Sequence, residues 1–139
     1  RRQTLALELA GGQLMVAGDP EELGQAFVNL VLNAIRLTPD GGRIIITTAA
    51  TASRCAVSVA DTGIGIPADE QERIFERFYQ LQDAMTHHSG TIEFLSGGLG
   101  LGLSIARAIA ENHGGTITVH SRAGAGSEFT LRLPRAEEL

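Results

Sequence analysis

The sequence predicts an α/β fold, a two-layer α/β sandwich in which three helices cover one face of a mixed, mostly antiparallel sheet of about five strands. Helical and strand-like segments alternate in mixed order, which is typical of a sheet packed against helices. The short connections between successive strands favour antiparallel neighbours over a doubly wound parallel sheet. We expect helices at 20–37, 67–75 and 101–113. We expect strands at 4–8, 13–16, 43–49, 55–60, 116–121 and 128–133.

The first helix has the clearest boundaries. Asp19 occupies the N-cap position, and Glu22 follows three residues later as in a capping box. Pro20 stands at the first helical position, where its missing N–H leaves no hydrogen bond unmade. The proline- and glycine-containing run 38–42 ends this helix, and the glycine pair at 114–115 ends the last one.

The composition is that of an ordinary soluble globule with one domain, residues 1–139, of which 43% are hydrophobic and 19% charged. A net charge of −5 argues against nucleic acid and against direct contact with an anionic membrane. The most apolar helical stretch, 26–37, is shorter than the ~20 residues that a membrane span needs. The abrupt start at Arg1 and the lack of a phosphoacceptor helix indicate a fragment of a longer protein. The single cysteine, Cys55, excludes an internal disulfide, is interpreted as a small buried strand residue, and is compatible with a reducing compartment.

The eleven residues counted as lysine or arginine are all arginine. A P-loop uses a lysine on the β- and γ-phosphates, and a protein-kinase site uses a strand lysine in a similar way. The sequence therefore excludes both of these nucleotide sites.

A polar stripe runs along the first helix, which is otherwise apolar around most of its girth. The stripe contains Glu22, Gln25, Asn29, Asn33 and Arg36. A buried amide without a partner costs about 1–3 kcal/mol, so these side chains must face water or a polar ligand. A solvent-facing stripe is the alternative, although exposed stripes more often carry Glu and Lys than repeated Asn, which has poor helix propensity.

The segment 61–67 follows a strand and begins with a carboxylate. Asp61 continues the period-two pattern of the preceding apolar strand residues, so it projects from the same face and needs a hydrogen-bond donor. The adenine amine is one such donor, and an Asx-turn into Gly63 is the alternative. Gly63 and Gly65 permit a close backbone approach and turns that other residues disfavour.

A third segment, 97–103, alternates glycine with leucine just before the last helix. Glycines permit close backbone contact with phosphate oxygens, and the N–H groups at a helix start attract anions. On its own this repeat is a weak signal, and it does not match the dinucleotide-binding fingerprint G-x-G-x-x-G.

Together and in this order, the segments 29–34, 61–67 and 97–103 resemble the N, G1 and G2 boxes of a sensor histidine kinase ATP-binding domain. Its Bergerat-type fold is shared with gyrase, heat-shock ATPase chaperones and mismatch-repair ATPases. The stretch 72–79 looks like the F box, which among these relatives points to the sensor kinases. The resemblance covers nearly the whole chain, from about Asp19 to Pro134.

The resemblance assigns roles to particular residues. Asn33 would bind Mg²⁺ through its carbonyl oxygen, a ligand that suits this hard cation. Asn29 and Arg36 would lie along the triphosphate as the other catalytic residues. Asp61 would recognise adenine. The remaining nucleotide-binding residues would be Gly63, Gly65, Ile66, Phe78, Gly98, Leu99, Gly100, Leu101, Gly102 and Ser127.

Two positions depart from the patterns of relatives. Leu37 stands where an aromatic residue is often found, so stacking on the purine from this position is lost. The ATP-hydrolysing relatives carry a glutamate general base one turn before the metal-binding Asn, whereas this chain has Asn29. An amide cannot accept a proton from water, so the pattern favours transfer of phosphate to another acceptor.

The long segment 80–97 is expected to be the ATP lid, because long loops in compact domains are usually lids, binding loops or disordered. It contains no Arg or Lys, unlike the lids of many relatives, and its only candidate cations are His87 and His88. A solvated loop pair is the plain interpretation of these histidines. A metal site at these two histidines lacks further ligands at suitable spacing, and a phosphoacceptor histidine would be followed by an acidic residue.

The resemblance implies the ATP-binding catalytic domain of a two-component sensor histidine kinase, with ATP and Mg as cofactors. Its partners would be the dimerising phosphoacceptor domain of the same kinase and the receiver domain of a response regulator. The alternative is a nucleotide-dependent binding module, such as a serine-kinase anti-sigma factor or a degenerate kinase switch. We expect a cytoplasmic domain, whether or not the parent protein is anchored in a membrane.

Overall fold

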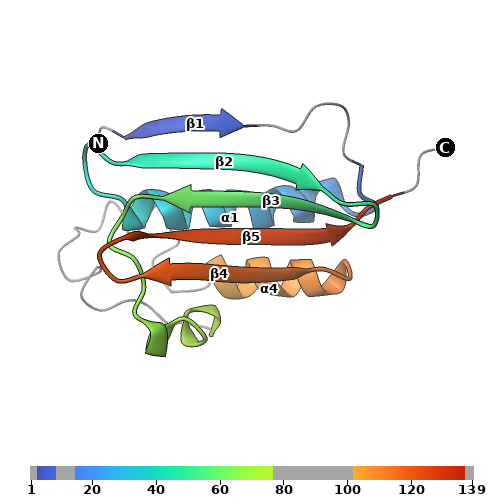
Figure 1. Ribbon diagram of the computed structural model, residues 1–139. Coiled ribbons are helices and arrows are strands. Elements are labelled where there is room, and N and C mark those ends of the chain that lie inside the picture. Colours follow the sequence, from blue (N-terminus) through green and yellow to red (C-terminus); the bar gives the residue numbers. More distant parts are fainter. Residues whose placement is uncertain (1–2, 9–14, 77–101, 137–139) are drawn as a thin grey trace.

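The computed structural model describes residues 3–8, 15–76 and 102–136, and its described part is a five-stranded sheet with two α-helices on one face (Figure 1). The strands are β1 (Thr4–Glu8), β2 (Arg43–Ala50), β3 (Arg54–Asp61), β4 (Thr116–Arg122) and β5 (Gly126–Pro134). The α-helices are α1 (Pro20–Leu37) and α4 (Gly102–Asn112). The predicted two-layer sandwich is confirmed.

The sheet is mixed, with the strand order β1-β2-β3-β5-β4. Only β1 and β2 run parallel, and the other three neighbouring pairs are antiparallel. The short β2–β3 and β4–β5 connections make hairpins, whereas the parallel neighbour β1 joins β2 by way of α1. The prediction of a mostly antiparallel sheet is therefore also confirmed.

Helix α1 begins and ends where the sequence predicts. Asp19 Oδ1 accepts hydrogen bonds from the N–H groups of Glu21 at 2.9 Å and Glu22 at 3.5 Å, which satisfies two of the free donors at the helix start. At the other end, Thr38 is fully buried and its hydroxyl donates to the carbonyl of Ala34 at 2.6 Å. This bond and Pro39 fix the end of the helix against the sheet.

The core lies between the two helices and the helix-facing side of the sheet. Its largest fully buried apolar side chains are Leu30 of α1, Ile44 of β2, Val59 of β3, Phe129 of β5 and Ile66. Helix α4 ends at Gly114, which has a φ of 76° that favours glycine, and the Gly115 N–H donates to the carbonyl of Ala110 at 2.8 Å.

Two predicted elements differ in the structure. The helix expected at 67–75 is instead two 3-10 helices, η1 (Ala68–Glu70) and η2 (Arg73–Phe75). A segment this short cannot support an α-helix by itself, and tertiary contacts set its conformation instead, above all those of Gln71 and Ile74. The strand expected at 13–16 lies partly outside the described residues, and Met15 and Val16 are not in a strand. The Met15 carbonyl accepts a hydrogen bond from the Ala136 N–H at 2.7 Å.

Candidate nucleotide site

The polar stripe of α1 is buried rather than exposed. Asn29 is 9% exposed and Asn33 is 4% exposed, although both lie on the side of the helix that the sequence marks as polar. The alternative of a solvent-facing stripe is therefore wrong for these two residues. The role of each buried amide group therefore depends on what it contacts.

Asn29 uses its amide within the protein. Its Nδ2 donates to the Gly102 carbonyl at the start of α4 at 3.0 Å, and its Oδ1 accepts from Gln25 Nε2 at 2.8 Å. Asn29 thereby fastens α1 to the first residue of α4. The structure brings together the predicted phosphate-binding residues Asn29 and Gly102.

Asn33 has one polar atom in use and one without a partner. Its Oδ1 accepts a hydrogen bond from Arg36 Nη2 at 3.2 Å, and its buried Nδ2 has no hydrogen-bond partner among the described residues. Burial also lowers the pKa of the Arg36 guanidinium from its ordinary value. A partly buried cation therefore lies directly beside the oxygen that is predicted to bind a metal.

Asp61 ends β3 on the helix-facing side of the sheet and is 6% exposed. Its Oδ1 accepts the Gly63 N–H at 2.9 Å, which is the Asx-turn that the sequence left open. Its buried Oδ2 has no hydrogen-bond partner in the described part of the chain. One carboxylate oxygen therefore shapes the turn, and the other is free to accept a hydrogen bond from a ligand.

Burial raises the pKa of Asp61 from 3.8 to about 6. The backbone N–H of Gly63 acts against this rise in pKa, and so does the backbone N–H of Ser127. Ser127 lies opposite Asp61 in the β3–β5 register but forms no hydrogen bond to Oδ2. A carboxyl group with a pKa near neutrality in a buried position is typical of functional sites.

The glycines of segment 61–67 are needed for packing within the protein. A Cβ on Gly63 would lie 2.1 Å from the Leu37 carbonyl oxygen, and one on Gly65 would lie 1.8 Å from that of Arg122. Gly65 also has a φ of 73°. The Ile64 N–H donates to the Leu37 carbonyl at 3.2 Å, so the end of α1 holds this segment in place.

Ser127 and Ile66 join the same cluster from the other side. Ser127 is 5% exposed and lies opposite Asp61 in the β3–β5 register. Its hydroxyl is 2.9 Å from that of Ser121, which in turn accepts the Ile66 N–H at 2.7 Å. The side chain of Ile66 is in the hydrophobic core, at 1% exposure.

Ser121 is not among the residues predicted from the sequence, although its position two residues before the β4–β5 turn places it opposite Ser127 in the register of the hairpin. Gln71 was not predicted either, and its Nε2 donates to the carbonyls of Ile66 at 2.9 Å and Ser121 at 3.0 Å. A glutamine in a short polar segment gives no sequence signal for such a tertiary contact.

Several predicted features lie outside the described residues. They are Phe78, Gly98, Leu99, Gly100, Leu101, the lid 80–97 and the histidine pair 87–88. The described part of the site consists of two groups. The first group lies on α1 and at the start of α4 and contains Asn29, Asn33, Arg36 and Gly102. The second group lies around the end of β3 and the start of β5 and contains Asp61, Gly63, Gly65, Ile66 and Ser127.

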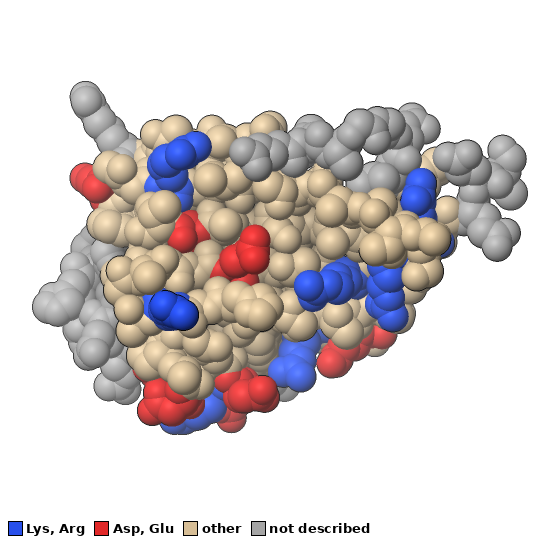
Figure 2. Space-filling model, viewed as in Figure 1, with Lys and Arg blue, Asp and Glu red and all other residues tan. Residues whose placement is uncertain are grey.

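The described surface of the uncovered sheet face carries scattered charges of both signs among uncharged side chains, without a continuous basic patch (Figure 2). No helix in the described residues is both long and apolar enough to cross a lipid bilayer.

The chain is similar to known proteins over most of its length. Residues 18–137 match the family described as histidine kinase-, DNA gyrase B-, and HSP90-like ATPase. The chain is 41% identical over 130 residues to the sensor histidine kinase RppB of Synechocystis sp. and 42% identical over 125 residues to the sensor-like histidine kinase SenX3 of Mycobacterium bovis. These alignments cover 94% and 90% of this chain but only 27% and 29% of the relatives, so the chain spans less than a third of their length.

Solved structures share the fold. The mycobacterial sensor histidine kinase MprB superposes with a TM-score of 0.79 at 26% identity, over 98% of this chain and 84% of that one. Full-length ShkA in complex with AMPPNP superposes with a TM-score of 0.79 at 30% identity, over 98% of this chain and 26% of that one. The histidine kinase ThkA in complex with the response regulator protein TrrA superposes with a TM-score of 0.75 at 31% identity, over 96% of this chain and 34% of that one.

Proposed function

Because this chain belongs to the histidine kinase-, DNA gyrase B-, and HSP90-like ATPase family, we propose that it is the catalytic domain of a sensor histidine kinase that binds Mg-ATP and delivers the γ-phosphate to a histidine on a separate domain. That histidine would pass the phosphoryl group to an aspartate of a response regulator. The domain would act in the cytoplasm.

One observation carries the proposal. Among the described residues, only two buried polar side-chain atoms lack a hydrogen-bond partner, namely Asn33 Nδ2 and Asp61 Oδ2. Such atoms are rare because each costs about 1–3 kcal/mol when it is left unpaired. Both belong to residues that the sequence assigns to the nucleotide. A bound nucleotide would supply the missing partners and offset their cost.

Asp61 would recognise the base. Its ionised Oδ2 would accept a hydrogen bond from the exocyclic amine of adenine, while Oδ1 keeps the Gly63 turn in place. Guanine carries a carbonyl oxygen at the corresponding position, which would repel the carboxylate. The same group therefore favours adenine over guanine.

The described residues fit a magnesium ion beside the triphosphate. Asn33 offers an amide oxygen, a ligand that Mg²⁺ prefers, and a single protein ligand is enough because the ion keeps waters and phosphate oxygens. Arg36 donates to this oxygen, so it would have to turn away from it and toward the phosphates. When bound, the ion would neutralise charge on the phosphates as the γ-phosphate leaves.

Asn29 would position the phosphate-binding start of α4 rather than activate water. Its amide is already bonded to Gly102 and Gln25, and it carries no basic group that could remove a proton. A water beside a bound γ-phosphate would therefore meet no general base at this position. This supports transfer to a protein acceptor.

Phosphate transfer to a separate acceptor tests the proposal. Incubated with γ-labelled ATP and the phosphoacceptor domain of its parent kinase, the chain should place acid-labile label on that domain. The chain alone should stay unlabelled. Of the two histidines in the described part of the chain, His113 lies at the end of α4 and His120 lies in β4, and neither is on an acceptor helix. Label on the chain itself, or none on the acceptor when ATP is bound, would contradict the proposal.

A further inference from the structure

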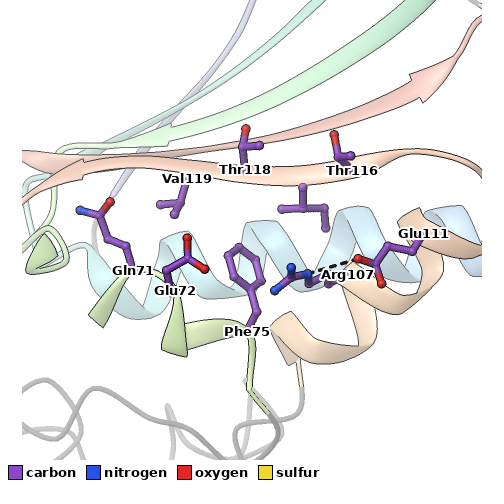
Figure 3. A pocket seen from close by; sticks show the side chains of 9 residues that line it. Gln71, Glu72, Phe75, Arg107, Glu111, Thr116, Thr118 and Val119 are labelled. Carbon is purple, nitrogen blue, oxygen red and sulfur yellow. Dashed lines mark hydrogen bonds and ion pairs between the residues drawn. The ribbon is translucent and has the colours of Figure 1, made fainter. Parts of the chain in front are cut away.

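A cavity of about 410 Å³ lies apart from the nucleotide site, between β4, α4 and the two 3-10 helices (Figure 3). Ile117 and Val119 of β4 line one side, and Arg107 of α4 lines the other. Glu72 and Phe75 of the 3-10 segment complete it. None of the described nucleotide-site residues lines this cavity, so it is a second and separate feature of the fold.

The cavity opens beneath a free sheet edge. Strand β4 is the last in the sheet order, and β5 is its only strand partner in the described part of the chain. Gln71 Nε2 donates to the Ser121 carbonyl at 3.0 Å, which shows that Ser121 directs its backbone polar groups away from β5. Because the pattern repeats every second residue, Val119 and Ile117 do the same. No described backbone group pairs with these two residues along this edge.

The cavity wall is apolar at one end. Ile117 is 7% exposed, and the Phe75 ring packs edge-on against Phe129 with centroids 6.2 Å apart. Arg107 lies over the Phe75 ring, with its guanidinium carbon 5.2 Å from the ring centroid, and also pairs with Glu111 at 3.4 Å. The charge of Arg107 is therefore already compensated.

The other end of the cavity is acidic. Glu72 is exposed, and Figure 3 shows its carboxylate directed toward Val119. In contrast to Glu76, which pairs with Arg73 at 3.4 Å, Glu72 forms no ion pair with any described residue. A ligand in this groove thus meets an apolar site beside Ile117 and an unpaired negative charge beside Val119.

We propose that this groove binds an extended segment of a partner protein, which adds to the edge of β4 as a further strand. The N–H and C=O groups of Ile117 and Val119 would bond its backbone, as in other cases of strand addition. Side chains two residues apart lie on the same face of a strand. The segment would therefore place a branched apolar side chain against Phe75 and, two residues away, a lysine or arginine over Glu72.

A second copy of this chain fits the groove less well. If two copies paired through β4, the side chains of the added strand on the cavity side would be Ile117, Val119 and Ser121. None of these carries a positive charge, so Glu72 would stay unpaired. The charge of the groove therefore favours a basic segment from a different protein.

Short peptides test the proposal by NMR on the ¹⁵N-labelled chain without nucleotide, so that failure of ATP binding does not affect the result. The probes are acetylated, amidated Thr-Val-Thr-Lys-Thr and Thr-Lys-Thr-Val-Thr, which carry the same pattern in both strand directions. At least one should shift the amide signals of Ile117 and Val119 in a saturable way. Replacing its lysine with glutamate should weaken binding by about fivefold, the upper range for an exposed ion pair. Methylating its backbone nitrogens should abolish binding.

A charge reversal supplies the matched control. Glu72→Lys should invert the preference, so that the glutamate peptide binds more tightly than the lysine peptide. Asp69→Lys, which changes an exposed residue of η1 outside the cavity, should leave the preference unchanged. The proposal is overturned if neither probe shifts these amides at millimolar concentration, or if Glu72→Lys keeps the original preference. Shifts that follow protein concentration instead of peptide concentration would indicate pairing between copies and would also overturn it.

Discussion

The side-chain amide of Asn29 donates a hydrogen bond of 3.0 Å to the backbone carbonyl of Gly102, across a sequence separation of 73 residues. This bond joins the middle of α1 to the first residue of α4. Both residues belong to segments that resemble nucleotide-binding boxes. The site is thus assembled by a direct contact between its α1 part and its α4 part.

Asn29→Ala should destabilise the folded chain by about 1–3 kcal/mol, because it removes a buried hydrogen bond to the Gly102 carbonyl. Chemical denaturation measures the change. Val28→Ala is the matched control, since Val28 is the preceding residue of the same helix, is 47% exposed and has a side chain that cannot form hydrogen bonds. Equal stabilities of the two variants would show that the contact contributes nothing.

Asp61 should make the stability of the ligand-free chain depend on pH. Its folded-state pKa of about 6 lies above its ordinary value of 3.8, so the folded protein holds this proton more tightly than the unfolded chain does. The stabilising contribution of the protonated group is present below about pH 4 and is lost as the pH rises through 6. Full ionisation then costs about 3 kcal/mol.

Asp61→Asn removes this titration, so the free energy of unfolding of the variant relative to the native chain should rise by about 2 to 3 kcal/mol between pH 4 and pH 8. Urea titrations at the two pH values give this difference. Asp69→Asn is the control, because Asp69 is exposed and should show no such change. A constant difference across pH for Asp61→Asn would mean that the carboxyl group titrates normally.

Adenosine should bind more weakly as the pH falls below 6, because the protonated Asp61 no longer offers a charged acceptor to the adenine amine. With a pKa of about 6, affinity at pH 5 should be about tenfold lower than at pH 8. Adenosine is the right ligand because a phosphate titrates in the same range. At pH 8, Asp61→Asn should lose about 1.5–3 kcal/mol of binding. The base assignment fails if this variant binds adenosine as the native chain does.

Asn33→Ala should remove most of the Mg²⁺ dependence of ATP binding, because it deletes the amide oxygen proposed as the metal ligand. Calorimetry with and without Mg²⁺ gives the dependence, and a thermal melt checks the fold. The control variant Glu21→Ala, an exposed change in the first turn of the same helix, should keep the Mg²⁺ dependence of ATP binding. An unchanged metal dependence in a normally folded Asn33→Ala variant would contradict the metal role.

Much of the fold could be predicted because local signals agreed with the tertiary structure. The cap at Asp19 and the ending at Thr38 fixed both ends of α1, and alternating apolar residues marked the strands. The 3-10 segment was missed as such because contacts of Gln71 with Ile66 and Ser121 hold it. Those partners are distant in sequence and leave no periodic pattern.

The site was predictable in its residues but not in its bonds. The spacing of Asn29 and Asn33 placed both on one polar face, yet only the structure separates their roles, since Asn29 is bonded at both ends and Asn33 is not. For Asp61, the sequence offered an Asx-turn or a ligand contact as alternatives. The structure makes them compatible, because each interpretation uses a different carboxylate oxygen.

Titration of the ¹⁵N-labelled chain with Mg-ADP is the sharpest test of the nucleotide site, because it reports both the affinity and the place of binding. We expect binding in the micromolar range, about −7 to −8 kcal/mol. The side-chain amide signals of Asn33 and the backbone amide of Gly63 should shift, and the amides of Ile117 and Val119 should stay in place. No saturable shift at Asn33 and Gly63, or shifts confined to β4, would contradict it.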